Sequence, residues 1–442
     1  MATVLPFKGI RYNPKIIDDL SAVTTPPYDV ISADEQDEFY RRHPNNVIRL
    51  ILNRTESTDT RENNPHTRSA THFKQWMSDG ILKQDDTLSL YVKAITYTHE
   101  GHDITRFGLI ALVGVEPFEK RIVLPHEKTY SKVKSERLGL IKATRCNYCP
   151  IFSLYPDDGS ILTTITDAID TLSPVENFTD EQGHRHRLWQ IVDPEIHRNV
   201  TKAMVDKRLF IADGHHRYET ALNYRNFLQE TDPAFDEHHP ANYVMMYLCS
   251  MSDPGLNILP AHRLVKDLTP EEMKRAIETS RSYFQVTPYP FTTENRRQVE
   301  KEFLAALETG SDKNCIGIYA HGSSVFYLLK LNAGVMDQLF EDELSPPLRR
   351  LDVTVLTRLI FMKILGFNQE RLDDETLIGY ASTSDKALKA IDDGNFDVAF
   401  ILNPTRIEQV QEVAQKGLIM PRKSTYFYPK VRSGLVMNTL VP

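Results

Sequence analysis

The spacing of hydrophobic positions predicts strands and helices that alternate along most of the chain. Residues 88–97 and 106–113 are apolar, β-branched and aromatic, and the polar residues between them predict a hairpin. Short apolar runs predict three further buried strands, at residues 151–155, 209–212 and 243–249. Helical spacing is found at two further segments, residues 135–143 and 218–228.

The pattern changes beyond about residue 266. Thr269, a proline and Glu272 form the start signal of a capped helix. Strand-like and helix-like segments then alternate: strands at 315–319, 324–331, 377–381 and 396–402, helices at 351–365, 385–391 and 408–415. This alternation predicts a small α/β lobe at the C-terminal end.

A chain of 442 residues is too long for one ordinary core, and about two to three domains are expected. The changes of pattern divide it into an N-terminal mixed α/β region (1–120), a central region (121–265) and a C-terminal α/β lobe (266–442). The predicted fold class is therefore α/β, of the mixed α+β kind.

Acidic residues exceed basic ones, 60 against 52, for a formal net charge of -8. No basic block offsets this charge, so a nucleic acid is not expected as the principal partner. No apolar run approaches the roughly 18 residues that span a membrane, and the N-terminus shows no signal peptide. Four cysteines do not make a disulfide framework, and the expected location is the cytoplasm.

The strongest chemical signal is the segment 213–217, which joins the predicted strand 209–212 to the predicted helix 218–228. Gly214 permits positive φ and a close approach of a ligand to the backbone. The helix start attracts anions, and His215, His216 and Arg217 add side-chain donors at that end. Asp213, at the tip of the strand, is placed to hold Mg²⁺ or to take a proton. The alternative is an ordinary capped helix with histidines on its surface.

A second group of polar residues, His126, Glu127 and Lys128, follows a proline. These residues could supply a general base and a phosphate or metal contact, or they could form a solvated loop. Weaker substrate-binding candidates lie beside other prolines or polar turns: Asp29, Arg49, His262 and Arg263. The chain has no Walker phosphate loop, no dinucleotide-binding glycine motif, no nucleophile elbow and no zinc-protease motif.

Several separated motifs resemble the family of domain of unknown function 1015 (DUF1015). They are Thr-Pro-Pro-Tyr-Asp-Val-Ile at 25–31, His-Glu-Lys at 126–128, Asp-Gly-His-His-Arg at 213–217, Pro-Ala-His-Arg at 260–263 and the aromatic tail at 423–430. The core at 213–217 also resembles the ParB/sulfiredoxin-like superfamily and its free serine kinases, over about residues 121–230. The resemblance implies a ParB/sulfiredoxin-like catalytic core in the central region, with additional N-terminal and C-terminal lobes.

The resemblance implies a kinase that makes O-phospho-L-serine from L-serine, with Mg²⁺ and with pyrophosphate, ADP or ATP as donor. Residues 215–217 would bind the donor phosphate with Gly214, His126 and Lys128, and Asp213 would contact Mg²⁺ or substrate. Glu127 is the closest counterpart of the glutamate that activates the hydroxyl, with Glu136 as the second choice. A preference for pyrophosphate is expected, since no feature of the sequence indicates a base or ribose pocket.

Two other functions stay open. One is a metal-dependent hydrolase with Asp213, His126, His215 and His216 as ligands, although adjacent histidines on a helix point about 100° apart. The other is a nucleotide-binding module like the ParB relatives, which the acidic charge disfavours. The oligomeric state cannot be read from the sequence.

Overall fold

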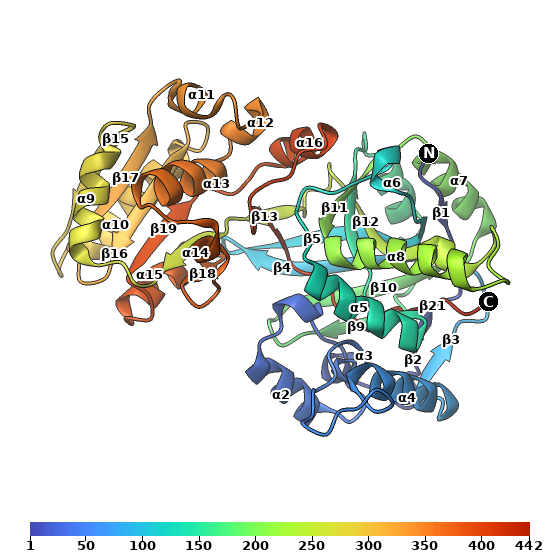
Figure 1. The fold of residues 1–442 in the computed structure, drawn as a ribbon. Helices are drawn as coiled ribbons and strands as arrows, with labels where there is room; N and C mark the ends of the chain where they lie inside the picture. Colours follow the sequence, from blue (N-terminus) through green and yellow to red (C-terminus); the bar gives the residue numbers. More distant parts are fainter. The chain divides into compact units, whose positions relative to one another are not determined.

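The structure is a computed structural model that describes residues 1–442, with the side chain of Lys132 outside the description. The chain forms two compact units: Met1–Asn257 together with Pro429–Pro442, and Ile258–Tyr428. Helices pack on β-sheets in both units, so the predicted mixed α/β class is confirmed (Figure 1). The predicted regions 1–120 and 121–265 both contribute strands to the main sheet of the first unit. The last segment of the chain, Pro429–Pro442, also belongs to this unit.

Among the described residues, the main sheet of the first unit has nine strands, in the order β6-β11-β8-β12-β5-β4-β10-β9 with β1 beside β5. Strands β11 and β6 run parallel, as do β12 and β8, and the other pairs are antiparallel. The bounds are β1 Val4–Leu5, β4 Leu90–His99, β5 His102–Gly114, β6 Val123–Leu124, β8 Ile151–Tyr155, β9 Glu176–Thr179, β10 Arg185–Ile191, β11 Leu209–Asp213 and β12 Tyr243–Ser250.

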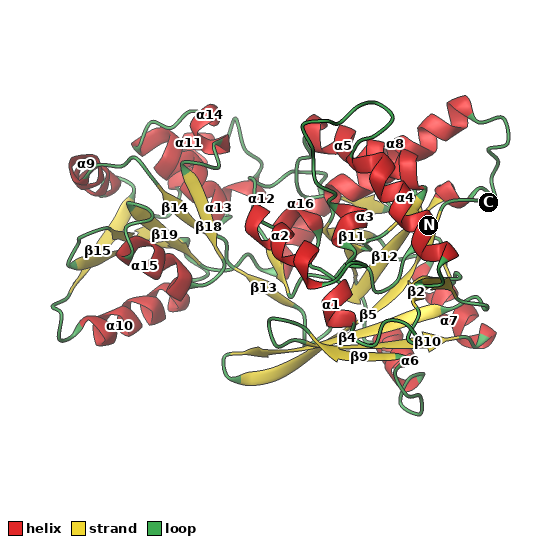
Figure 2. Cartoon of the chain, turned by 90° about the horizontal axis from the view of Figure 1, so that it is seen from below, coloured by secondary structure: helices red, strands yellow, loops and turns green.

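The predicted hairpin is confirmed as β4 and β5, which lie beside β10 and β9 in Figure 2. Its turn residues Glu100 and Gly101 both have positive φ, 51° and 79°. Two consecutive positive φ angles are typical of the tight turns whose twist matches that of the flanking strands.

The two faces of this sheet differ in chemistry. Val92 and Ala94 of β4 lie in a large apolar cluster with residues of α6 (Ser160–Asp167) and α7 (Pro194–Met204). Side chains alternate along a strand, so Lys93 lies on the opposite face. There Arg106 of β5 has its guanidinium carbon 4.6 Å from the ring centre of Phe152 and 5.5 Å from that of Tyr247. The second face is therefore a buried polar layer.

Helices α5 (Ser131–Thr144) and α8 (His215–Thr231) pack side by side, and α4 (Pro65–Ser78) packs on α5 (Figure 1). Helix α8 begins directly after β11, as the sequence predicts. The remaining elements of this unit are β2 Ile10–Tyr12, α1 Leu20–Val23, the 3-10 turn Tyr28–Val30, α2 Ala33–Arg42, α3 Ile48–Ile51, β3 Leu82–Gln84, β7 Cys146–Asn147 and β21 Asn438–Thr439.

The second unit contains an antiparallel sheet in the order β15-β17-β16-β19-β14-β18. Its strands are β14 His262–Val265, β15 Phe284–Pro290, β16 Cys315–Ala320, β17 Val325–Leu331, β18 Ile378–Ala381 and β19 Val398–Leu402. Its longer helices are α9 Pro270–Ser280, α10 Arg296–Thr309, α15 Ser384–Asp392 and α16 Ile407–Gln415. The helix predicted at 351–365 is split into α13 (Asp352–Thr354) and a π-helical stretch, Val355–Ile364.

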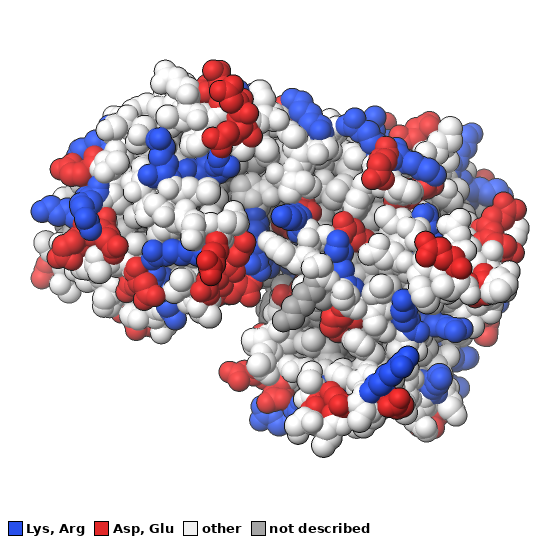
Figure 3. All heavy atoms as spheres, viewed as in Figure 1, with Lys and Arg blue, Asp and Glu red and all other residues white. Residues whose placement is uncertain are grey.

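Acidic and basic side chains are intermixed on the face of the protein that Figure 3 presents. No helix in the described part of the chain combines the length and apolar character needed to cross a membrane.

Candidate active site

A β-bulge turns Asp213 toward the buried polar layer. Strand β11 pairs Ile211 with Ser153, but the next pair is Asp213 with Phe152, so Ala212 is the extra residue. Paired residues share a face of a sheet, and Phe152 faces the guanidinium of Arg106. The bulge therefore places the Asp213 carboxylate on the polar face, while Ile211 stays in the apolar core.

Gly214 forms the link between β11 and α8. Its φ of +96° lies in the region that favours glycine, and a Cβ here would lie 2.8 Å from Arg217 Nε. Its carbonyl accepts the first helical hydrogen bond, from the Tyr218 N–H at 3.0 Å. The sequence predicted that a ligand approaches this glycine closely; in the structure the side chain of Arg217 lies there.

We expect Gly214→Ala to lower the free energy of unfolding by roughly 1–3 kcal/mol, because strain and a steric clash add. Gly183→Ala is the matched control, since Gly183 has a φ of +81° and a Cβ there would meet nothing within 4 Å. Urea denaturation of both variants measures the difference. Equal losses of stability would show that the approach of Arg217 to Gly214 is not a constraint.

Asp213 lies between two cations. One carboxylate oxygen is paired with Lys430 Nζ and the other with a terminal nitrogen of Arg217. Burial alone would raise the pKa of Asp213, but Lys430 and Arg217 outweigh it and hold the pKa well below its usual range. Asp213 is therefore ionised at neutral pH and is a poor acceptor for a substrate proton.

Arg217 is held by further groups of the chain. Its Nη1 donates to the Pro150 carbonyl at 2.6 Å and to Cys149 Sγ at 3.3 Å. Its Nε is buried and has no hydrogen-bond partner. Burial opposes the charge of Arg217, but Cys149, Asp213 and Asp29 outweigh burial and raise its pKa. The guanidinium is thus a cation whose position is fixed by groups of the chain.

The segment 124–130 lies against the start of α8 through the two histidines. His215 Nε2 accepts from the His126 N–H at 3.3 Å, and its Nδ1 lies 3.6 Å from a carboxylate oxygen of Glu127. His216 Nε2 accepts from the Tyr130 N–H at 3.0 Å. The sequence related these residues to one another only by resemblance, and the structure brings the two motifs together.

The two inner histidines are neutral. Burial lowers the pKa of His126 to about 4 and lowers that of His215 well below its ordinary value, with His126 adding to the effect. Because His215 Nε2 accepts a hydrogen bond, its proton lies on Nδ1, which faces Glu127. The Nδ1–H of His215 is therefore directed toward the Glu127 carboxylate.

The other predicted site residues have separate surroundings. Lys128 and Asp29 are exposed, and Asp29 contributes to the charge balance of Arg217. Arg49 donates to the carbonyls of His43 and Tyr40, at 2.9 and 2.8 Å. These two bonds tie α3 to the end of α2.

His262 and Arg263 belong to β14 of the second unit and are buried there. His262 Nδ1 accepts from the Leu402 N–H at 3.1 Å, and Arg263 Nη2 donates to the carbonyls of Arg422 and Lys423, at 2.9 and 3.0 Å. Both side chains are thus bonded to the backbone of their own unit.

We expect His262 to make the second unit less stable as the pH falls from about 6.5 to 4. Burial, then Arg263, lowers the pKa of His262 to about 4. The unfolded chain therefore binds a proton in this window that the folded unit does not bind, which costs up to about 3 kcal/mol. Urea denaturation at pH 7 and pH 4.5 should show a smaller pH effect for His262→Asn, which keeps an acceptor. An equal pH effect in both proteins would refute this role.

The structure adds residues that local sequence patterns did not single out for this site. Lys430, near the end of the chain, forms an ion pair with Asp213. Cys149 and Pro150 accept hydrogen bonds from Arg217. The only sequence signal for Lys430 was its place in the aromatic tail motif at 423–430.

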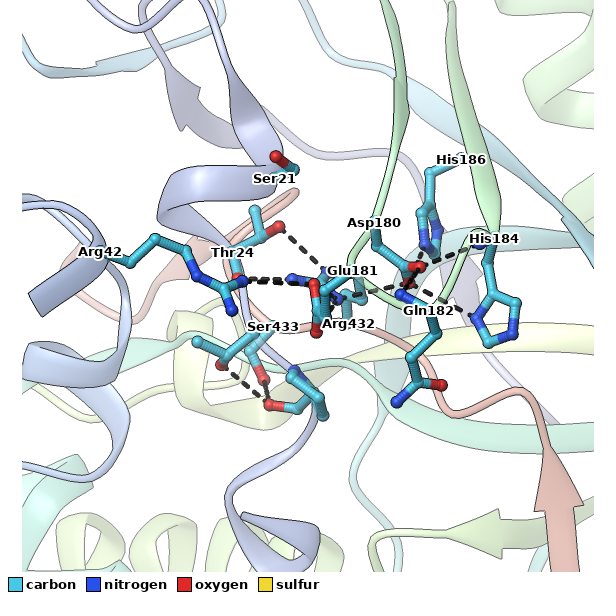
Figure 4. A network of polar contacts seen from close by, with 12 residues as sticks. Ser21, Thr24, Arg42, Asp180, Glu181, Gln182, His184, His186, Arg432 and Ser433 are labelled. Atoms are coloured by element: carbon cyan, nitrogen blue, oxygen red, sulfur yellow. Dashed lines mark hydrogen bonds and ion pairs between the residues drawn. The ribbon is translucent and has the colours of Figure 1, made fainter. Parts of the chain in front are cut away.

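A second polar cluster lies at the turn between β9 and β10 (Figure 4). Asp180 Oδ2 lies 2.8 Å from His186 Nε2, 3.4 Å from His184 Nδ1 and 3.3 Å from Arg432 Nη1. In the described part of the chain these three side chains, Asp180, His184 and His186, form a group with metal-ligand spacing. Magnesium prefers oxygen ligands, and Arg432 already neutralises the carboxylate, so the cluster does not fit Mg²⁺.

Asp213, the predicted Mg²⁺ ligand, also does not form a magnesium site with its neighbours, because each of its oxygens is paired with a cation. In the hydrolase alternative, the Nε2 atoms of His215 and His216 each accept a backbone N–H group. These contacts do not favour a metal centre at 213–217.

By fold, the protein is of the mixed α/β class. Its first unit contains a charged strand–glycine–helix turn in its interior. The family model "Protein of unknown function (DUF1015)" matches residues 4–354, and the chain belongs to this family. The family resemblance inferred from the separated motifs is thereby confirmed.

Solved structures give weak likenesses. A free serine kinase variant in complex with AMP aligns over 72% of this chain and 87% of its own, at 12% identity and a TM-score of 0.36. A conserved hypothetical protein from Pyrococcus furiosus aligns over 73% of this chain and 92% of its own, at 11% identity and a TM-score of 0.34. No curated protein matches the chain. Likenesses this weak carry no functional conclusion.

Proposed function

We propose that this protein is a small-molecule kinase that transfers a phosphoryl group to the hydroxyl of free L-serine. The product is O-phospho-L-serine, and the donor is pyrophosphate, ADP or ATP, with pyrophosphate expected to be the best. The observation that carries the proposal is the turn at 213–217, where Arg217 and Lys430 lie at the start of α8 beside Glu127 and His215. The choice of L-serine as the phosphoryl acceptor rests on the resemblance of this motif to free serine kinases.

Phosphoryl transfer requires cations and N–H donors around the transferring group, and little covalent chemistry from the protein. The start of α8 favours phosphate oxygens, because the first N–H groups of a helix have no helical carbonyl partner and the helix dipole attracts anions. Arg217 Nε and the ammonium of Lys430 would stabilise the charge on the same oxygens. Asp213 would position both cations while remaining ionised.

The reaction forms one phosphorus–oxygen bond and breaks another, and one proton is transferred. The serine Oγ attacks the terminal phosphorus of the donor, and the bond from that phosphorus to the bridging oxygen breaks. Phosphate leaves from pyrophosphate, AMP leaves from ADP, and ADP leaves from ATP. The hydroxyl proton passes to a carboxylate of the protein.

Glu127 is the better candidate for this carboxylate. It lies beside His215 Nδ1, whereas Glu136 is paired with Arg137 and lies 3.3 Å from His66 Nε2. Burial would raise the pKa of Glu136, but His66 and Arg137 outweigh it and lower the pKa, which makes this carboxylate a weaker base. We therefore propose Glu127 as the general base.

The resemblance implies Mg²⁺, and the assay should contain it. Because the residues around Asp213 do not form a magnesium site, the proposed steps depend on Arg217, Lys430 and the start of α8.

Steady-state kinetics tests the function directly. L-serine phosphorylation is measured with pyrophosphate, ADP and ATP side by side, with D-serine and L-threonine as alternative acceptors. We expect the highest kcat/KM for L-serine with pyrophosphate. A tenfold preference for either nucleotide would contradict the donor assignment, and better use of another acceptor would contradict the assignment of serine.

A further inference from the structure

Lys93 is a buried amine at the middle of the main sheet. On β4 it pairs with Gly108 of β5 on one side and with Leu188 of β10 on the other. Its side chain is 0% exposed, and Nζ has no hydrogen-bond partner. It lies on the same face as Arg106 and Asp213, away from the apolar core that contains Val92 and Ala94.

The charged groups around Lys93 do not provide it with a counter-ion. Burial lowers its pKa well below the ordinary value, and the guanidinium groups of Arg432 and Arg106 lower it further, against weaker effects of Cys149 and Asp180. The Asp180 carboxylate is already bonded to His184, His186 and Arg432, as Figure 4 shows. The interior around Lys93 thus carries an excess of cations.

A second buried atom nearby also has no partner. His186 Nε2 faces Asp180, and its Nδ1 is buried with no hydrogen bond. Leu188 pairs with Lys93 and His186 pairs with Ile95, so Lys93 and His186 are diagonal neighbours on one face of β4 and β10. Lys93 accordingly lowers the pKa of His186, after burial and against the effect of Asp180. An unpartnered donor and an unpartnered acceptor in one buried layer point to a polar ligand.

Lys93 is also connected to the candidate active site. Cys149 opposes the lowering of the Lys93 pKa. Its Sγ accepts a hydrogen bond from Arg217 Nη1 at 3.3 Å. A cavity of about 70 Å³ is lined by Tyr28, Cys149 and Arg217 among others. Arg217, which lines this cavity, pairs with Asp213 on the face of the sheet that Lys93 also occupies.

A buried amine without a partner destabilises the folded protein, whereas an apolar side chain of similar length would not. Methionine at this position should therefore preserve or increase stability. A residue that costs stability and makes no bond in the protein is understandable when a ligand supplies its partner.

We propose that Lys93 binds an anionic oxygen of the ligand at this site. Under the proposed function, on which the choice of ligand rests, this oxygen belongs to the α-carboxylate of L-serine or to a phosphate of the donor. The carboxylate is the better fit, because the amino group of serine can at the same time donate to His186 Nδ1.

Lys93→Met tests the proposal through two effects of opposite sign. The melting temperature without ligand should be unchanged or higher, while L-serine or inorganic pyrophosphate should bind at least tenfold more weakly by calorimetry. Weaker binding of L-serine alone identifies the carboxylate, and weaker binding of pyrophosphate alone identifies the donor phosphate. Lys93→Gln provides a second uncharged variant for the same comparison.

Tyr97→Phe is the matched control on the same strand and face. Its hydroxyl donates to the Gly255 carbonyl at 3.1 Å, so the variant should lose stability and keep ligand affinity. Lower stability of Lys93→Met with unchanged affinity for both ligands would overturn the proposal. If the wild-type protein binds these ligands through Lys93 but makes no phosphoserine, the proposed function fails and the role of Lys93 stands.

Discussion

Replacing Arg217 with alanine should lower kcat/KM for phosphoserine formation by at least about a hundredfold, or roughly 2.7 kcal/mol of transition-state stabilisation. The guanidinium is fixed by Asp213, Pro150 and Cys149, so it needs no reorganisation when charge develops on the phosphoryl group. Steady-state kinetics with saturating and limiting donor measures the loss. Near-wild-type turnover would show that Arg217 does not contribute to catalysis.

The same change should also destabilise the protein, because Asp213 loses one of its two cations in a buried place. A loss of roughly 3 kcal/mol is expected for breaking a buried pair. The surroundings of this pair are closed, since Asp213 is only 8% exposed.

The variant Arg225→Ala serves as a control that separates the loss of catalysis in Arg217→Ala from its loss of stability. Arg225 lies on the same helix and bonds the Val115 carbonyl, so its loss also removes a guanidinium–backbone contact. Kinetics at a temperature where both variants are folded should show a large defect for Arg217→Ala and little for Arg225→Ala. Equal defects would assign the effect to stability.

Glu127→Gln should lower kcat by about a hundredfold or more while donor affinity is retained. Glutamine keeps the size of the side chain and can still contact His215, but it cannot accept the serine proton. Glu136→Gln is the control, because its carboxylate is engaged by Arg137 and His66. An active Glu127→Gln together with an inactive Glu136→Gln would reverse the assignment of the base.

Local sequence signals predicted the parts of the fold whose order depends on neighbouring residues. The hairpin β4–β5 follows from two apolar runs around a tight turn, and the strand–glycine–helix unit follows from β11, Gly214 and α8. Their prediction requires only the alternation of apolar and polar residues in strands, the spacing of apolar residues in helices and the conformational freedom of glycine.

The sequence could not predict which distant groups meet at the turn. Lys430 pairs with Asp213 across 217 positions of the chain, and no local pattern indicates this contact. The bulge that turns Asp213 to the polar face depends on its register with β8, which is a tertiary property. The burial of His126 and Lys93 likewise depends on segments that pack over them.

The most direct test is a phosphorus NMR experiment on the purified protein with L-serine, Mg²⁺ and pyrophosphate. We expect the pyrophosphate signal to be replaced by equal amounts of phosphate and O-phospho-L-serine, at a rate that Arg217→Ala reduces at least a hundredfold. Release of phosphate without phosphoserine would indicate a hydrolase. The absence of phosphoserine with pyrophosphate, ADP and ATP alike would contradict the assignment of a free serine kinase.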